Sequence, residues 1–111
     1  MDERVEKWLH DIRLAIEEID SFFHDNEKTF EVFRQNLILK RAIERNLEII
    51  GEAVNRILSR DSNIEIDNAK KIVGLRNHII HLYDNISEET VWAIVINNIP
   101  KLKKEIDSLL V

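Results

Sequence analysis

With 111 residues, the chain fits one compact domain, expected over residues 1–111, and its two glycines and one proline are too few for a turn-rich β architecture. The lack of cysteine excludes disulfides and thiolate sites, and no long apolar run or leader pattern predicts a membrane span or export, so the expected location is cytoplasmic. A net charge of −5 argues against a wholly basic nucleic-acid-binding domain, although residues 34–76 hold nine Lys/Arg against six Asp/Glu and would permit a phosphate-facing surface.

The first half of the chain predicts two helices. Apolar residues recur at steps of three and four between residues 2 and 24, which is typical of one buried helical stripe, and Asp2 is the expected cap. Thr29 can cap a second helix that runs without interruption to residue 58 and spans roughly 45 Å. This helix carries a second, narrower apolar stripe nearly opposite the first, formed by Ile38, Ala42, Ile49 and Ala53. Two apolar sides on one helix predict a dimer interface.

The second half predicts two further helices. The third begins at the cap Asp67 and ends near Asp84 and Asn85, and the fourth begins at Ser87 and continues to about residue 109. Pro100 lies inside the fourth helix and removes a backbone donor, so a kink or break is expected between Ile96 and Ile99. The expected fold is all-α, an up-and-down bundle of four to five helices.

If each residue turns the helix by about 100°, Arg76 lies in the middle of the apolar face of the third predicted helix. A guanidinium keeps its charge, so burying it costs several kcal/mol unless carboxylates or carbonyls pair with it. One interpretation is structural: Arg76 pairs with an acid of the second helix, for which the candidates are Glu44, Glu48 and Glu52. The other interpretation is functional, because reactive groups surround the arginine.

The polar residues after Arg76 are Asn77, His78, His81, Tyr83 and Asp84. On an ideal helix His81 points about 140° away from Arg76, so both reach one site only if the helix ends or bends there, or if two chains share the site. At a pH near its ordinary pKa of about 6.5, a histidine can take a proton from a ribose hydroxyl. An arginine can stabilise the charge that collects on the phosphate. The spacing of His78, His81 and Asp84 fixes no metal-ligand set, so neither a metal nor another cofactor is expected.

Residues 76–83 have the form Arg, four residues, His, any residue, Tyr, and they resemble the signature of the HepT-like toxins of the HEPN superfamily. The stretches that flank this motif are also similar to the family pattern: residues 50–53, 72–75, 91–92 and 99–100. One departure is Asp67-Asn68, where family members often have a Pro-Trp-like element before the third helix.

The resemblance implies a helical-bundle homodimer whose two motifs face each other across a cleft and cleave RNA as a metal-independent endoribonuclease. It also implies an antitoxin partner, an MntA-type minimal nucleotidyltransferase that neutralises the toxin by AMPylation of the motif tyrosine, here Tyr83. By matching position, Arg76 would stabilise the transition state, His81 would act as acid or base, and Asn77 would support them.

A second function stays open at this point: a non-catalytic helical module that docks a nucleotidyltransferase. An open cleft that contains both Arg76 and His81 would favour the enzyme, since a docking protein has no need of an unpaired arginine. His10 and His24 are expected on the surface, and Trp8 and Trp92 are expected in the core.

Overall fold

The computed structural model describes residues 1–66, 68, 72–74 and 87–111, and the regular structure in these ranges is helical. Residues 72–74 are helical as well. The all-α prediction is therefore confirmed. The elements follow the order α1 (Glu3–Phe22), α2 (Phe30–Gln35), α3 (Leu37–Arg60), α5 (Glu88–Ala93), a π-helix η2 (Ile94–Asn98) and α6 (Ile99–Leu109).

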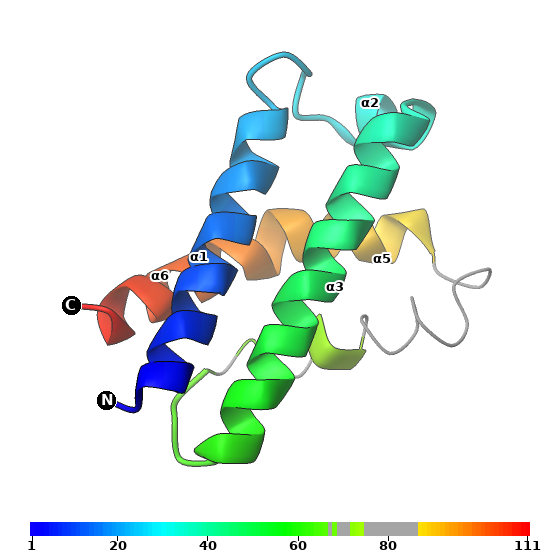
Figure 1. The fold of residues 1–111 in the computed structure, drawn as a ribbon. Helices are drawn as coiled ribbons and strands as arrows, with labels where there is room; N and C mark the ends of the chain where they lie inside the picture. The colour runs from blue at the N-terminus through cyan, green and yellow to red at the C-terminus, as the bar shows by residue number, and fades with distance from the viewer. Residues whose placement is uncertain (67, 69–71, 75–86) are drawn as a thin grey trace.

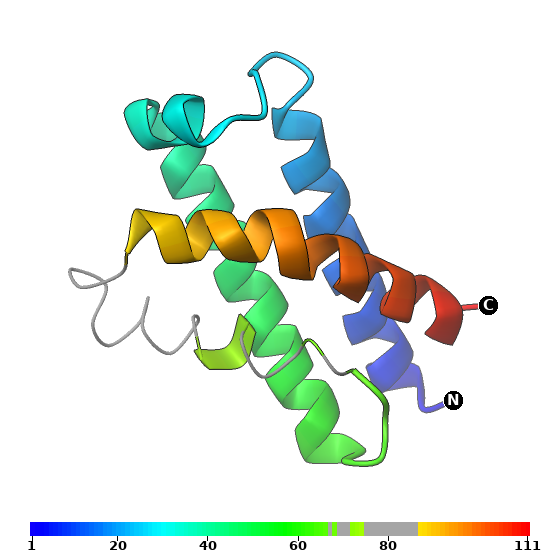
Figure 2. The ribbon, with the colours of Figure 1, turned by 180° about the vertical axis from the view of Figure 1, so that it is seen from behind.

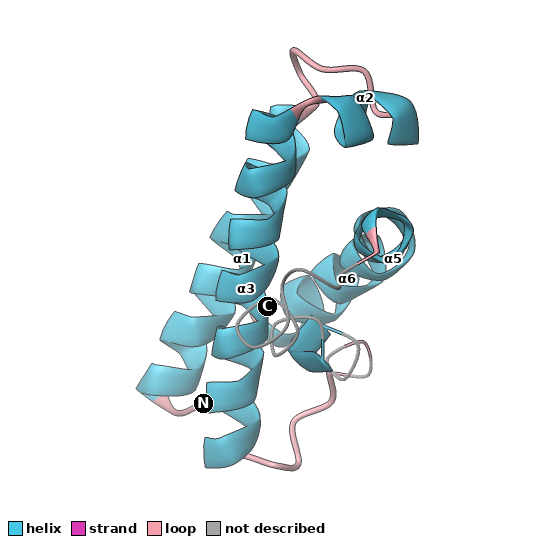
Figure 3. Cartoon of the chain, turned by 90° about the vertical axis from the view of Figure 1, so that its right-hand side faces the viewer, coloured by secondary structure: helices cyan, strands magenta, loops and turns pink. Residues whose placement is uncertain are grey.

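The helices form two layers. Helices α1 and α3 run antiparallel, side by side, and make up the first layer (Figure 1). Helix α5, η2 and α6 follow one another without a break and form a single C-terminal rod, residues 88–109, which crosses α1 and α3 on one side (Figure 2). A view turned by 90° separates the layers, with α1 and α3 in one and α5 and α6 in the other (Figure 3). The opposite side of the α1/α3 layer, called here the outer face, is covered by none of the described elements.

The core lies between the two layers and consists of the apolar stripes that the sequence predicts. The stripe of α1 is buried almost completely along its length, and α3 contributes the largest share. Each fully buried Leu or Ile side chain stabilises the fold by about 1.5–3 kcal/mol relative to an exposed one. The largest fully buried side chains are Phe33, Leu9, Ile12, Ile16, Ile19, Ile43, Leu47, Ile50, Ile57, Ile72, Leu102 and Ile106.

The predicted caps Asp2, Thr29 and Ser87 are confirmed. Asp2 Oδ1 accepts hydrogen bonds from the backbone N–H groups of Arg4 and Val5, at 2.8 and 3.3 Å. Thr29 Oγ1 accepts from the N–H of the residue three positions later, at 3.2 Å, and Ser87 Oγ does the same at 3.3 Å. Each bond satisfies a backbone donor that the first helical turn leaves without an intrahelical partner.

The prediction of one uninterrupted helix over residues 29–58 is wrong, because the helix is interrupted at Asn36. This residue has extended backbone angles (φ −101°, ψ 100°) and ends α2 while it caps α3. Its side-chain oxygen accepts from the N–H of Leu39 at 3.0 Å, and its amide nitrogen donates to Asn26 Oδ1 at 3.4 Å. An asparagine competes well with the helix for backbone donors, and here the side-chain bonds prevail over the apolar periodicity. Helix α3 alone, with 24 residues, is about 36 Å long.

The irregularity predicted from Pro100 is confirmed, and it takes the form of the π-helix η2. Pro100 lies in the first turn of α6, directly after the π segment, and because it has no N–H it cannot donate to the carbonyl one turn earlier in the rod. Among the described residues, none of the helices combines the length and the apolar character needed to cross a membrane.

An ion pair closes the end of the α1/α3 layer and makes its stability depend on pH. Asp2 Oδ2 accepts from Arg60 Nε at 2.9 Å, so the cap of α1 is tied to the last residue of α3. This hydrogen bond is the main reason that the pKa of Asp2 lies below its ordinary value of 3.8. Because the folded pKa is depressed, the stabilisation is present above the unfolded value and is lost as the pH falls through the folded pKa.

We expect Asp2→Asn, which keeps a capping oxygen but loses the charge, to be less stable than the parent at neutral pH. The difference should vanish in acid, when Asp2 of the parent is also protonated. Urea unfolding of both proteins from about pH 7 to about pH 2 measures this, with Asp25→Asn, a change at an exposed acid, as the control. A difference that stays constant over the whole pH range would contradict the assignment.

Candidate functional site

The predicted site residues Arg76, Asn77, His81 and Tyr83 lie outside the described residues. The structure does describe the chain on either side of them: residues 72–74 before the motif, and Ser87 onward after it. These flanking residues, with the contacts that hold them, form the frame of the site.

The entry side of the frame is held by apolar anchors and by an amide network. Ile66 and Ile72 are buried in the core, at 6% and 0% exposure. Between them, Asn68 donates twice to Glu105 Oε1 of α6, from its backbone N–H at 3.4 Å and from its side-chain amide at 3.0 Å. Asn68 Oδ1 accepts from Asn98 Nδ2 at 3.3 Å. The segment that leads to Arg76 is thus bonded to the C-terminal rod.

The exit side is held by the start of α5. Ser87 caps this helix and its hydroxyl also donates to Glu89 Oε2 at 2.7 Å, which is the main cause of a lowered pKa for Glu89. Glu88 lies 3.3 Å from Lys40 Nζ of α3, and its side chain is partly shielded from solvent. Val91, one turn later, is buried at 1% exposure.

Aromatic contacts fix the same end of the rod against the other layer. The ring of Trp92 stacks on Phe33 of α2 with 5.3 Å between centroids, and Phe23 meets Trp92 edge-on at 5.9 Å. Such pairs add about 0.5–1.5 kcal/mol each beyond the area they bury. Trp92 is half-buried and packs against the core, as predicted from its place on an apolar stripe.

One element therefore holds both ends of the motif. Helix α5 starts at Glu88, five residues after Tyr83, and η2 and α6 supply Asn98 and Glu105 to the segment before the motif. Residues 72–74 and the rod lie on the same side of α3 (Figures 2 and 3). A rigid support of this kind is what a site needs if it must keep an arginine and a histidine in register.

Two of the three carboxylates predicted as partners of Arg76 have neighbours on α3 itself. Glu52 accepts from Arg56 Nη2 at 2.7 Å, and Glu44 lies 3.7 Å from Arg41 Nη1. Within the described ranges, no three side chains of the types His, Cys, Asp and Glu come together in a geometry that could hold a metal ion. His10 and His24 are exposed, as predicted.

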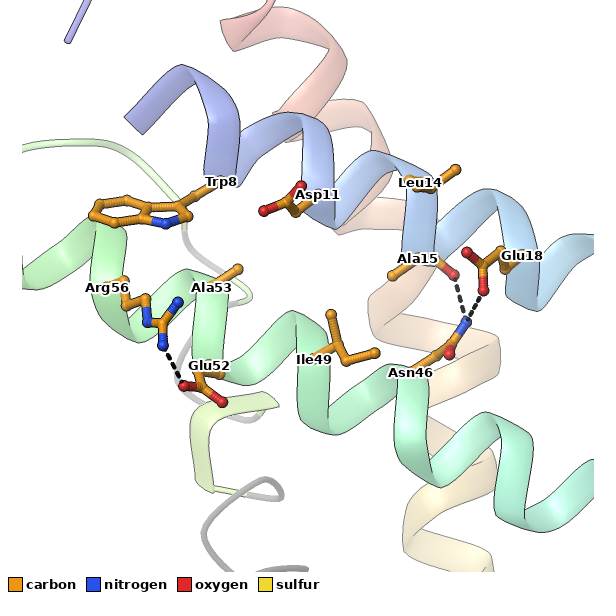
Figure 4. Close-up of a pocket in the computed structure, with 10 residues that line it drawn as sticks. All are labelled: Trp8, Asp11, Leu14, Ala15, Glu18, Asn46, Ile49, Glu52, Ala53 and Arg56. Carbon is orange, nitrogen blue, oxygen red and sulfur yellow. Dashed lines mark hydrogen bonds and ion pairs between the residues drawn. The ribbon is translucent and has the colours of Figure 1, made fainter. Parts of the chain in front are cut away.

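A pocket between α1 and α3 opens on the outer face, away from the rod (Figure 4). Trp8 and Ala53 line it, together with two exposed apolar side chains: Leu14 at 56% and Ile49 at 39% exposure. Ile38 lies within about 20° of Ile49 on the helix and is 83% exposed. The second stripe of α3 thus borders this face, whereas residues 72–74 lie on the other side of the helix.

Comparison with known proteins agrees with this frame. The family model described as "Ribonuclease HepT-like" matches residues 12–109. The chain is 36% identical over 105 residues to a Methanocaldococcus jannaschii protein named "Putative RNase MJ1380", which covers 93% of this chain and 94% of that protein.

Two further relatives carry similar names. A Thermococcus cleftensis protein named "Probable ribonuclease HepT" is 32% identical over 103 residues, 92% of each chain. A Caldanaerobacter subterraneus protein named "Putative RNase TTE0752" is 34% identical over 84 residues, 74% of each chain. No solved structure matches the chain. The chain belongs to the HepT-like ribonuclease family, and the resemblance read from residues 76–83 is confirmed.

The sequence interpretation missed Asn68 and Asn98. Asn68 directly follows the expected cap Asp67, and Asn98 lies on the apolar stripe of the fourth helix, between Val95 and Ile99. The available signal was the one that singled out Arg76: a polar side chain where the periodicity calls for an apolar one.

Gly74, two residues before Arg76, supplies a test of the space beside the motif. Its φ is not positive, and an added Cβ would meet no described atom within 4 Å. We expect Gly74→Ala to raise the free energy of unfolding, by up to about 1 kcal/mol, because alanine reduces the entropy of the unfolded chain. Thermal unfolding measures the change.

Gly51→Ala is the matched control for this prediction, since Gly51 is buried on α3, and a methyl group added to a packed position costs about 1–3 kcal/mol. A Gly74→Ala protein that is less stable than the parent would show that the space beside Gly74 is filled.

Proposed function

We propose that this protein is a metal-independent endoribonuclease that cleaves RNA and acts as the toxin of a toxin–antitoxin pair. The observation that carries the proposal is the family match over residues 12–109, which includes the whole motif from Arg76 to Tyr83. The names of the relatives, which specify ribonucleases, support the same activity.

The proposed chemistry needs only the side chains of the motif. His81 takes the proton of a ribose 2′-hydroxyl, and the oxygen of that hydroxyl attacks the neighbouring phosphorus while the bond to the 5′-oxygen of the next nucleotide breaks. The leaving 5′-oxygen takes a proton from solvent, and the imidazolium of His81 returns its proton to solvent. Arg76 binds the negative charge that collects on the phosphoryl oxygens, and Asn77 supports the pair. A fixed guanidinium suits this role because it stays charged at any working pH and donates two parallel hydrogen bonds.

The frame around the motif supports a catalytic site rather than a loose docking segment. Both ends are held by one rod through Asn68, Glu105, Glu88 and Trp92, and general acid–base chemistry depends on such fixed placement. A surface that only docks a protein does not need its segment held from both sides.

A homodimer is part of the proposal, because the angle of about 140° between Arg76 and His81 on an ideal helix is resolved if two chains share a site. The exposed Ile38 and Ile49 support a second chain on the outer face. Since that face points away from residues 72–74, a dimer on the outer face would keep the two motifs apart, and a shared site requires the chains to meet on the side of the C-terminal rod instead.

The direct test is RNA cleavage in the presence of EDTA by the purified, unmodified protein. We expect the parent to cleave, and we expect His81→Ala and Arg76→Ala each to reduce the rate by about 10²–10⁴-fold, the range for loss of an acid–base group or a charge-stabilising donor. His10→Ala, which removes an imidazole from an exposed position outside the motif, should leave the rate unchanged. A folded, unmodified parent that leaves RNA intact would favour the alternative, a helical module that docks a nucleotidyltransferase.

Tyr83 is the proposed acceptor of AMP from an MntA-type nucleotidyltransferase antitoxin. Each AMP would bring a negative phosphate and a bulky nucleoside beside Arg76, where they compete with the RNA phosphate. We expect the parent to gain AMP when it is incubated with that enzyme and ATP, and to lose its ribonuclease activity.

Intact-mass measurement of Tyr83→Phe makes the site unambiguous, because Tyr83 is the only tyrosine in the sequence. Tyr83→Phe should keep cleaving RNA and gain no AMP; AMP on this variant would place the modification elsewhere.

A further inference from the structure

Asn98 is a buried amide in an otherwise apolar helix face. Its exposure is 8%, and its neighbours on the rod are the buried side chains Val95, Ile99 and Leu102. An amide taken out of water without a partner costs about 1–3 kcal/mol, so a residue of this type inside a core is retained where its hydrogen bonds serve a purpose.

The π-helix η2 ends at Asn98 and changes where this amide points. On an unbroken α-helix Asn98, seven residues after Val91, would lie within about 20° of Val91 and would face the centre of the core. A π turn holds more residues than an α turn, so the residues at its end are rotated relative to an α-helical continuation. Pro100 accounts for the irregularity of the helix here, and at the end of the π segment the Asn98 amide nitrogen lies 3.3 Å from Asn68 Oδ1.

Asn68 forms hydrogen bonds with both η2 and α6. Its Oδ1 accepts from Asn98, and its side-chain and backbone N–H groups both donate to Glu105 Oε1. Asn68 lies between the buried residues Ile66 and Ile72, eight residues before Arg76. The three polar side chains therefore tie Asn68 to the rod.

We propose that Asn98 is a positioning residue for the ribonuclease site: acting through Asn68, it fixes the entry of the motif segment to the same rod that holds its exit. The inference rests on the proposed function. Asn98 touches no substrate in this role. It sets the placement of Arg76 relative to the segment that follows, so its loss lowers the rate of the bound complex more than it weakens RNA binding.

Asn46 provides a matched control, because it is the other buried polar side chain of the described residues. Its amide donates to the carbonyl of Ala15 at 3.2 Å and to Glu18 Oε2 at 3.3 Å (Figure 4). These bonds join α1 to α3 and have no contact with the segment that leads to the motif. Asn46→Ala and Asn98→Ala thus remove comparable buried amides from different places in one fold.

The experiment compares kcat and KM for RNA cleavage by the full chain, together with melting temperature and hydrogen exchange of peptides covering residues 66–86. Both variants should melt below the parent. Asn98→Ala should reduce kcat by about ten-fold, the ratio that corresponds to loss of one hydrogen bond, with KM within about two-fold of the parent. It should also speed exchange in the 66–86 peptides. Asn46→Ala should leave that exchange unchanged, and in samples matched for oligomeric state, because Asn46 lines the outer-face pocket beside Ile49, it should leave kcat unchanged as well.

Asn68→Ala removes the same contact from a half-buried position and covers the case in which Asn98→Ala fails to fold. If the two residues act as a unit, the double variant loses no more activity than either single one. An equal loss of kcat in Asn46→Ala and Asn98→Ala, or an unchanged kcat and exchange in Asn98→Ala, would overturn the inference.

Failure of the proposed function gives a different result. In that case the parent itself would leave RNA intact, while the exchange comparison of Asn98→Ala with Asn46→Ala would still decide whether Asn98 holds the segment. Unchanged exchange would then refute the positioning role as well.

Discussion

The fold depends on the burial of one face of α3. This helix packs against α1 along its length and follows directly on α2, and the pair of Lys40 with Glu88 joins it to the C-terminal rod. Its inward side chains Ile43, Leu47, Ile50 and Ile57 are inaccessible to water. Burial of apolar surface supplies most of the driving force, but it is not directional. The caps at Asp2, Asn36 and Ser87 decide where α1, α3 and α5 begin, and the pair Asp2–Arg60 ties the start of α1 to the end of α3.

Burial also explains why a polar residue on an apolar stripe is informative. A charged or amide side chain within a core is costly, so it must be paired, or it must serve a site. Asn98 and Asn46 are paired through their amides. Arg76 occupies an equivalent place on the predicted face of the third helix, and in the proposed function its partner is the phosphate of the substrate.

The C-terminal rod shows how an irregular helix can serve two purposes. Its first part carries Val91 and Trp92, which anchor the exit of the motif, and its later part carries Asn98 and Glu105, which anchor the entry. The π-helix between them lets both parts present the required side chains to the rest of the molecule. π turns of this kind recur at functional sites in proteins, since a regular helix is more favourable wherever no function opposes it.

The sequence by itself determined the helical class, most helix starts, the irregularity near Pro100 and the family, because apolar periodicity, capping residues and the spacing of Arg76, His81 and Tyr83 are all local in the chain. The tertiary structure decided the contact of Asn36 with Asn26 and the network of Asn68, Asn98 and Glu105. The contact from Asn98 to Asn68 joins residues thirty positions apart, and the bond from Asn36 to Asn26 spans ten. Pairings over such distances follow from how helices pack, and no local pattern of residues encodes them.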